Sequence, residues 1–140
     1  MDMEKILPTR GQLERQMSQT LQSLYRQQFG HLLSKITCHL FADKVAIVAE
    51  GSVTSIEEIL FKHSRVDLAR SVRLAISEDF TTQVKQAVGK ILEVEIIDIM
   101  TDSAIETGYL GIIIFLQNAP EIRLTKKKAD RSRSLKAKID

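Results

Sequence analysis

The stretch FADKVAIVAEGSVTSIEEIL, residues 41–60, holds a turn, an apolar strand and a helix start in succession. Apolar and polar residues alternate along KVAIVAE (44–50) and along the preceding ITCHLF (36–41), a period typical of β-strands. We therefore predict a β-hairpin. Its two-residue loop is Ala42-Asp43, or Asp43-Lys44 if the register shifts by one.

Gly51 follows the second strand and is predicted to end it. Thr54 and Glu57 then have the spacing of a capping box, in which each side chain bonds the backbone amide of the other residue. A short helix is predicted from there to about Lys62. Each feature of this stretch thus has a sufficient backbone explanation.

A longer helix is predicted upstream, from about Arg10 to Phe29. Thr9 and Gln12 form a second capping box, and Gly30 can supply the left-handed residue that ends the helix. One apolar stripe runs along it at helical spacing. Its members are Leu13, Met17, Leu21, Leu24 and Tyr25.

The core-forming helix is predicted downstream, from about Asp67 to Leu92. Gly89 lies near its end and costs about 1 kcal/mol relative to alanine. Apolar residues recur every four positions at Leu68, Val72, Ile76, Phe80, Val84 and Val88. The other faces are assigned to Arg70, Arg73, Glu78, Lys85 and Lys90.

Two more strands are predicted at 94–102 and 109–117, joined by SAIETG, where Gly108 suits a positive φ. The second run is apolar on both faces, and so is 45–49. Central strands of this kind need cover on two sides. Three helices cover one face of a sheet well and the other only partly, so we expect a homodimer that buries the remaining face.

The predicted fold class is α+β, with two layers in the order α-ββ-α-α-ββ: an antiparallel sheet of two β-hairpins packed by helices. With 140 residues, 44% of them hydrophobic, the chain is long enough for one domain with its own core. The expected division is a flexible 1–8, a domain at 9–119, and a tail at 120–140. The single Cys38 favours a buried thiol and a reducing, cytoplasmic setting. No apolar run reaches the length of a transmembrane segment, so we expect a cytoplasmic protein that can also lie at a membrane surface.

Charge is distributed unevenly. Residues 121–140 contain eight Lys/Arg and three acidic residues, whereas the preceding body contains 12 basic and 15 acidic residues. Such a tail is predicted to be disordered, and it suits an anionic surface, an acidic protein or nucleic acid. The candidate binding residues in it are Lys126, Lys127, Lys128, Arg131 and Arg133.

The sequence predicts no catalytic, cofactor-binding or metal site. The three histidines fall in different elements without a second ligand at helical or strand spacing, and no glycine-rich phosphate loop occurs. The best polar concentration in the body is a possible ligand loop with Asp102, Glu106 and Thr107. Hydrogen bonding of the loop backbone is the competing explanation for these residues.

Three segments carry a resemblance to a known family: TRGQLERQMSQTLQSLYRQQFG, VAIVAEGSVTSIEEIL, and LARSVRLAISEDF through to YLGIIIFL. The specific elements are Gly11-Gln12-Leu13, Gly51-x-x-Thr54-x-x-Glu57, and Asp102 followed by Thr107-Gly108. Over about residues 9–117 the chain resembles MpsC, a bacterial family named for a sodium-translocating, membrane-potential-generating system.

The resemblance implies a non-catalytic accessory or regulatory protein beside a membrane ion or inorganic-carbon transport system, with a protein partner there. It supplies no catalytic residues. Two alternatives stay open: a nucleic-acid-binding or transcription-linked regulator that uses the basic tail, and an enzyme or small-ligand sensor that uses the 98–106 region.

Overall fold

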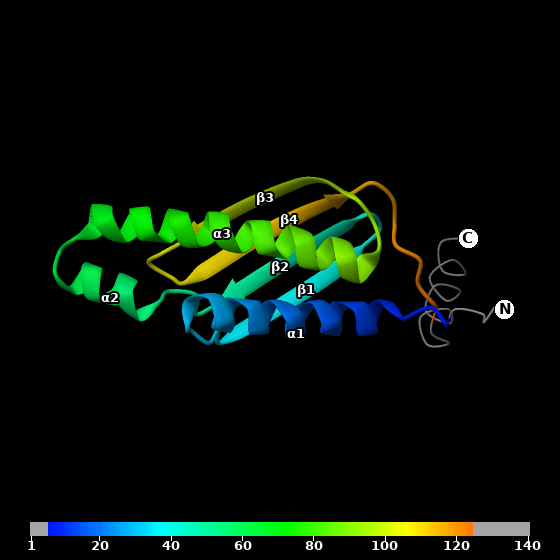
Figure 1. Cartoon of the computed structure of the whole chain (residues 1–140), viewed down its shortest axis with the longest axis horizontal. Helices are drawn as coiled ribbons and strands as arrows, with labels where there is room; N and C mark the ends of the chain where they lie inside the picture. Colours follow the sequence, from blue (N-terminus) through cyan, green and yellow to red (C-terminus); the bar gives the residue numbers. More distant parts are fainter. Residues whose placement is uncertain (1–5, 125–140) are drawn as a thin grey trace, which may run out of the picture.

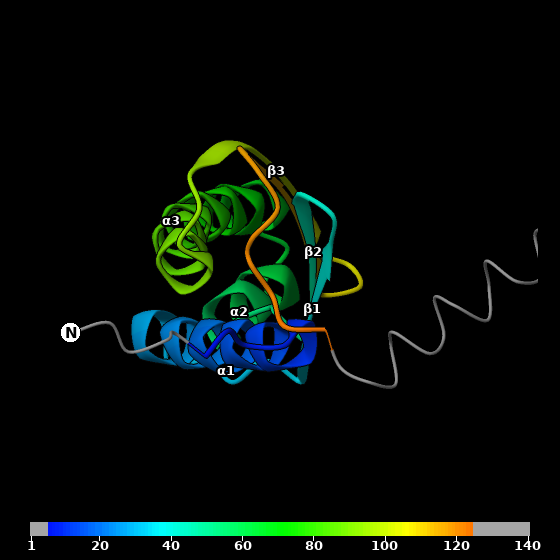
Figure 2. The same cartoon turned by 90° about the vertical axis from the view of Figure 1, so that its right-hand side faces the viewer.

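A computed structural model describes residues 6–124 as two packed layers. One layer is a four-stranded antiparallel sheet in the order β1-β2-β4-β3. The other holds the helices α1 and α3, which lie on one face of the sheet (Figures 1 and 2). The elements in chain order are α1 (Arg10–Phe29), β1 (Lys35–Phe41), β2 (Lys44–Glu50), α2 (Ser55–Lys62), α3 (Val66–Leu92), β3 (Ile96–Ala104) and β4 (Tyr109–Leu116). The predicted α+β class and element order are confirmed.

Helix α1 begins and ends as its sequence predicts. The Thr9 side chain accepts from the Gln12 amide at 3.1 Å, and the Gln12 side chain accepts from the Thr9 amide at 2.8 Å. Gly30 takes φ 63° and closes the last turn with a bond to the Arg26 carbonyl.

The two hairpins pair through their second strands, which puts β2 and β4 at the centre of the sheet. Phe41 pairs with Lys44, so the first loop is Ala42-Asp43, the first of the two predicted registers. The run at 109–116 that is apolar on both faces is indeed a central strand.

The second hairpin differs from its prediction at β3. The strand was predicted at 94–102 and lies at Ile96–Ala104. Glu93 turns with φ 53° to end α3, so the next residues serve as the connection, and a bulge follows between Ile96 and Asp98. At its far end the strand continues because Ala104 still pairs with Tyr109.

The core lies between the sheet and the two long helices. Phe80, Val84 and Val88 of α3 are fully buried, as are Met17 and Leu21 of α1. Cys38 is buried in β1, as predicted. The strand contributions to this core are Leu40, Val45, Ile47, Leu110, Ile112, Ile114 and Leu116.

The chain continues along the body after β4. Pro120 is buried and Ile122 packs against the core. The Arg123 amide donates to the Pro8 carbonyl at 2.8 Å, which joins the two ends of the described chain. The tail residues Lys126, Lys127, Lys128, Arg131 and Arg133 lie outside residues 6–124.

Candidate functional site

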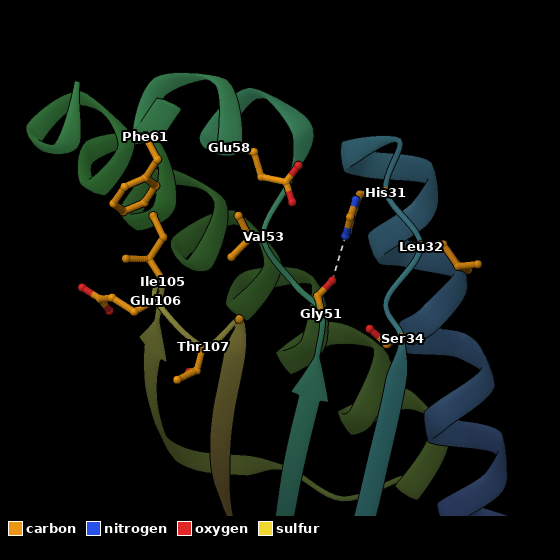
Figure 3. Close-up of a pocket in the computed structure, with 11 residues that line it drawn as sticks. His31, Leu32, Ser34, Gly51, Val53, Glu58, Phe61, Ile105, Glu106 and Thr107 are labelled. Carbon is orange, nitrogen blue, oxygen red and sulfur yellow. Dashed lines mark hydrogen bonds between the residues drawn. The ribbon is translucent and has the colours of Figure 1, made fainter. Parts of the chain in front are cut away.

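Three connections meet at the end of the sheet opposite the termini: residues 30–34, residues 51–54, here called the elbow, and the β3–β4 loop at 105–108 (Figures 1 and 3). The Ser52 amide and hydroxyl both donate to the Gly108 carbonyl, at 3.0 and 2.8 Å. The elbow and the loop are therefore joined directly.

Glycine is required where these connections touch. Gly51 has φ 68°, and a Cβ there would lie 1.8 Å from the Ser34 hydroxyl oxygen. Gly108 has φ 80°, and its Cβ would meet the Gly51 Cα at 3.6 Å. His31 Nε2 bonds the Gly51 carbonyl at 2.7 Å, which fastens the first connection to the elbow (Figure 3).

A buried ion pair lies behind the elbow. Arg73 of α3 donates from Nε to Glu57 Oε2 at 2.7 Å and from Nη2 to Glu57 Oε1, so the contact is bidentate. The two residues are 4% and 0% exposed. Arg73 Nη2 also donates to the Ser52 carbonyl at 2.8 Å, and the Tyr25 hydroxyl donates to the same oxygen.

The capping box of α2 belongs to this network. Glu57 Oε1 accepts from the Thr54 amide at 3.0 Å and from the Thr54 hydroxyl at 2.9 Å. One carboxylate thus starts α2 and also ties it to α3. Removing its partner would leave a charge buried without compensation.

The pKa directions follow from this arrangement. Burial alone would raise the pKa of the Glu57 carboxyl, but the hydrogen bonds from Arg73 and Thr54 and the charge of Arg73 outweigh it and hold the pKa below its usual range. Burial raises the pKa of the Tyr25 phenol. The pair is therefore ionised at neutral pH, with a neutral tyrosine beside it.

A hollow of about 710 Å³ opens between the elbow, α2 and the β3–β4 loop, and is here called the elbow pocket (Figure 3). Apolar residues make up part of its wall, and Glu58 and Glu106 lie at its rim. The Glu58 carboxylate lies across from His31, and the Glu106 side chain points outward from the hollow (Figure 3). The apolar residues that line it are Leu32, Val53, Phe61 and Ile105, of which Leu32 has its side chain pointing away from the other three (Figure 3). The polar members outside the rim are Ser34 and Thr107, with the glycines Gly51 and Gly108.

The structure places the three residues of the predicted ligand loop at two hollows. Glu106 and Thr107 line the elbow pocket, and Glu106 also faces Arg70 at 3.7 Å with both side chains largely exposed. Asp102 lies on β3 and lines, together with Glu106, a smaller hollow of about 320 Å³ beside α3. Bonds to the local backbone are present at two of the three residues: the Asp102 carboxylate accepts from the next amide at 2.9 Å, and the Thr107 hydroxyl donates to the Ala104 carbonyl at 3.3 Å.

Sequence reasoning missed Arg73, which it had assigned to an outer face of α3. Four residues turn an α-helix by about 40° more than one full turn. A row of residues spaced by four therefore drifts away from the buried side of α3 towards its start, and Leu68 is 44% exposed. The buried line near the start of α3 runs instead through Ala69, Arg73, Ile76 and Phe80. Arg73 lies seven residues, or about two helical turns, before the buried Phe80, and this spacing could have identified Arg73 as facing the core.

Taken together, these features define a small α+β domain with a pocket of mixed polar and apolar lining at one end of its sheet. Among residues 6–124 no helix is long and apolar enough to cross a membrane. The family model for MpsC, described as "Na+-translocating membrane potential-generating system", matches residues 9–118. The chain belongs to this family. Searches of curated proteins and of solved structures gave no match.

Proposed function

We propose that this protein is a non-catalytic accessory or regulatory protein that binds a component of a membrane ion or inorganic-carbon transport system. The description of its family supports the membrane system. The observation that carries the proposal is the elbow pocket, which combines an apolar wall with carboxylates at its rim.

The chemistry of the pocket suits one kind of segment. Cytoplasmic loops of membrane proteins are enriched in Lys and Arg, and the apolar ends of transmembrane helices adjoin them. A segment of this kind would place apolar side chains against Val53 and Phe61. Its cationic groups would meet Glu58 and Glu106, since complementary charge favours encounter and fixes orientation.

The bonding of the buried polar groups supports binding rather than a reaction. Glu57, Arg73, Thr54 and Tyr25 bond one another and the Ser52 carbonyl. The bonded atoms hold α2 and the elbow in position, and the second terminal nitrogen of Arg73, Nη1, is buried without a hydrogen-bond partner among residues 6–124. They thus serve to keep the pocket wall in place.

Site-specific photo-crosslinking tests the proposal in membranes of the native host. A photoreactive phenylalanine derivative at Phe61, whose ring lines the pocket (Figure 3), should crosslink to a subunit of a transport system. The same group at exposed Gln86 on α3 is the control and should not. Crosslinks of equal yield from both positions, or none from Phe61, would contradict the proposal.

Charge variants sharpen this test. Glu58→Lys with Glu106→Lys should abolish the crosslink because both rim carboxylates become cations. Glu95→Lys with Glu121→Lys changes the net charge equally at exposed positions outside the pocket and should leave the crosslink unchanged. An equal loss in both variants would show that overall charge, not the pocket, governs binding.

Deleting residues 125–140 separates this proposal from binding by the tail. The shortened chain should still crosslink through Phe61. If the crosslink needs the tail, or if the tail gives a nucleic-acid affinity that falls steeply with salt and the crosslinked partners are nucleic-acid-bound proteins, the nucleic-acid alternative replaces the proposal.

A further inference from the structure

The face of the sheet that points away from α1 and α3 is not covered by any helix among residues 6–124 (Figure 2). The strand registers place four rows of side chains on this open face. Several are large and exposed, among them Val48 at 44%, Met100 at 54% and Tyr109 at 51%. Exposed apolar residues gathered on one face in this way are typical of an interface.

The centre of the open face alternates in size between its two central strands. Ala46 of β2 pairs with Ile113 of β4, and in the next row Val48 pairs with Gly111. Each row therefore holds one small and one large residue, and the large one changes strand between rows. Nothing lies within 4 Å of a Cβ built at Gly111, so that position is an open recess.

Charges on the open face separate by strand. Asp98 and Asp102 of β3 point to this face, and each carboxylate bonds the next amide of its own strand. The opposite half carries Lys35, His39 and Lys44. Neighbours partly offset these cations: Asp43 bonds Lys44 at 2.7 Å, Glu14 lies 3.2 Å from His39, and Glu50 pairs across from Lys35.

We propose that a second copy of this chain packs on the open face, related by a two-fold axis parallel to the strands. Such a rotation places β2 over β4 of the second copy and β1 over its β3. Val48 of each copy then enters the recess at Gly111 of the other copy. Ala46 of each copy likewise contacts Ile113 of the other. This is the self-complementarity that a two-fold interface requires.

The charges select this axis over the perpendicular one. With the axis parallel to the strands, Asp98 and Asp102 face Phe41 and Thr37 on β1 of the second copy. The cationic side chains of Lys35 and His39 lie in the neighbouring rows of that strand. The aliphatic stem of Lys44 packs over Phe115 of the second copy. Within one copy these two residues are cross-strand neighbours. A perpendicular axis would place β3 over β3 and bring four carboxylates together, which is unfavourable.

The dimensions of the sheet place this dimer among the smaller interfaces. Four strands spaced about 4.8 Å apart and rising about 3.4 Å per residue give a face of roughly 20 by 25 Å. That is below the roughly 800 Å² per partner of a standard stable complex. We therefore expect a reversible, concentration-dependent dimer.

A substitution in the recess tests the contact. Gly111 lies outside the left-handed region of φ and has free space above it, so Gly111→Gln should fold normally. Sedimentation of the full chain should show a concentration-dependent dimer for the wild type and a monomer for Gly111→Gln. Ala75→Gln, at an exposed position of α3, is the matched control and should dimerise like the wild type.

A pair of charge variants tests the axis. One variant carries Asp98→Lys with Asp102→Lys, and the other carries Lys35→Glu with Lys44→Glu. Each alone should be monomeric, and an equal mixture should form the heterodimer in native mass spectrometry. A monomeric wild type, a Gly111→Gln variant that dimerises normally, or variants that fail to associate when mixed would each overturn the proposal.

Discussion

The two capping boxes of this chain have the same pattern in the sequence and different roles in the structure. The Thr9–Gln12 box of α1 is exposed to solvent and satisfies two amides of the first turn. The Thr54–Glu57 box of α2 is buried, and its carboxylate also binds Arg73 of α3. A local motif thus starts a helix in both places, but only the buried one joins separate parts of the fold.

The difference comes from the chemistry of the third position. Gln12 is neutral and can lie in water, whereas Glu57 carries a charge whose burial demands a partner. Arg73 supplies that partner, and the pair fixes α2 as the wall of the elbow pocket. The following experiments test this difference between the two capping boxes.

Removing the arginine should have the largest effect. Arg73→Ala leaves Glu57 buried without its counter-charge, so we expect a loss of about 3–5 kcal/mol in the free energy of unfolding, measured with urea. The control is Arg70→Ala, whose partner Glu106 is 3.7 Å away at an exposed site. That control should lose less than about 1 kcal/mol. Equal losses would show that the buried pair has no special role.

Acid should weaken the buried box selectively. The pKa of Glu57 is lower in the folded chain than its ordinary value, so the pair contributes its full stability above the ordinary carboxyl range and loses it as pH falls toward the folded pKa. Glu57→Gln should be less stable than the wild type at neutral pH, and the gap should narrow in acid. A gap that stays constant with pH would contradict ionisation of Glu57.

The tyrosine should matter less than the ion pair. Tyr25→Phe removes one hydrogen bond to the Ser52 carbonyl, but that oxygen keeps its bond from Arg73. We expect a loss of about 1 kcal/mol in urea unfolding. The nearby Phe29→Leu variant is a control for ring packing, since Phe29 contacts the Tyr25 ring without a polar bond. A loss as large as that of Arg73→Ala would mean that the phenol, not the ion pair, holds the elbow.

The exposed box should give the smallest effect. Thr9→Ala removes one cap, for which we expect a loss of about 0.5–1 kcal/mol in the same assay. The stability of this variant should not share the acid dependence of Glu57, because no buried charge is involved. If Thr9→Ala proved as costly as Arg73→Ala, the contrast between the two boxes would fail.

Local chemistry made most of the fold predictable. Both caps, the Ala42-Asp43 loop and the positive φ of Gly30 and Gly108 are properties of a few consecutive residues, and the structure confirms them. The β3 boundary was wrong by two residues because Glu93 ends α3 in a left-handed turn that sequence alone does not reveal.

The candidate site was predictable only in part. Glu106 and Thr107 were identified, but the elbow pocket forms from three connections that are distant in sequence. Arg73 was missed because a charged residue was assumed to face water. Its contact with Glu57 spans sixteen positions, so only tertiary structure brings the two together.

The most direct test of the central claim, that the elbow pocket binds an apolar and basic segment, is an amide chemical-shift titration of the nitrogen-15-labelled full chain. The probe is a short peptide of leucine and lysine. Saturable shifts should appear at Leu32, Val53, Phe61 and residues 105–108, and Glu58→Lys with Glu106→Lys should abolish them. Equal shifts with a leucine and glutamate peptide, or shifts absent from these residues, would contradict the claim.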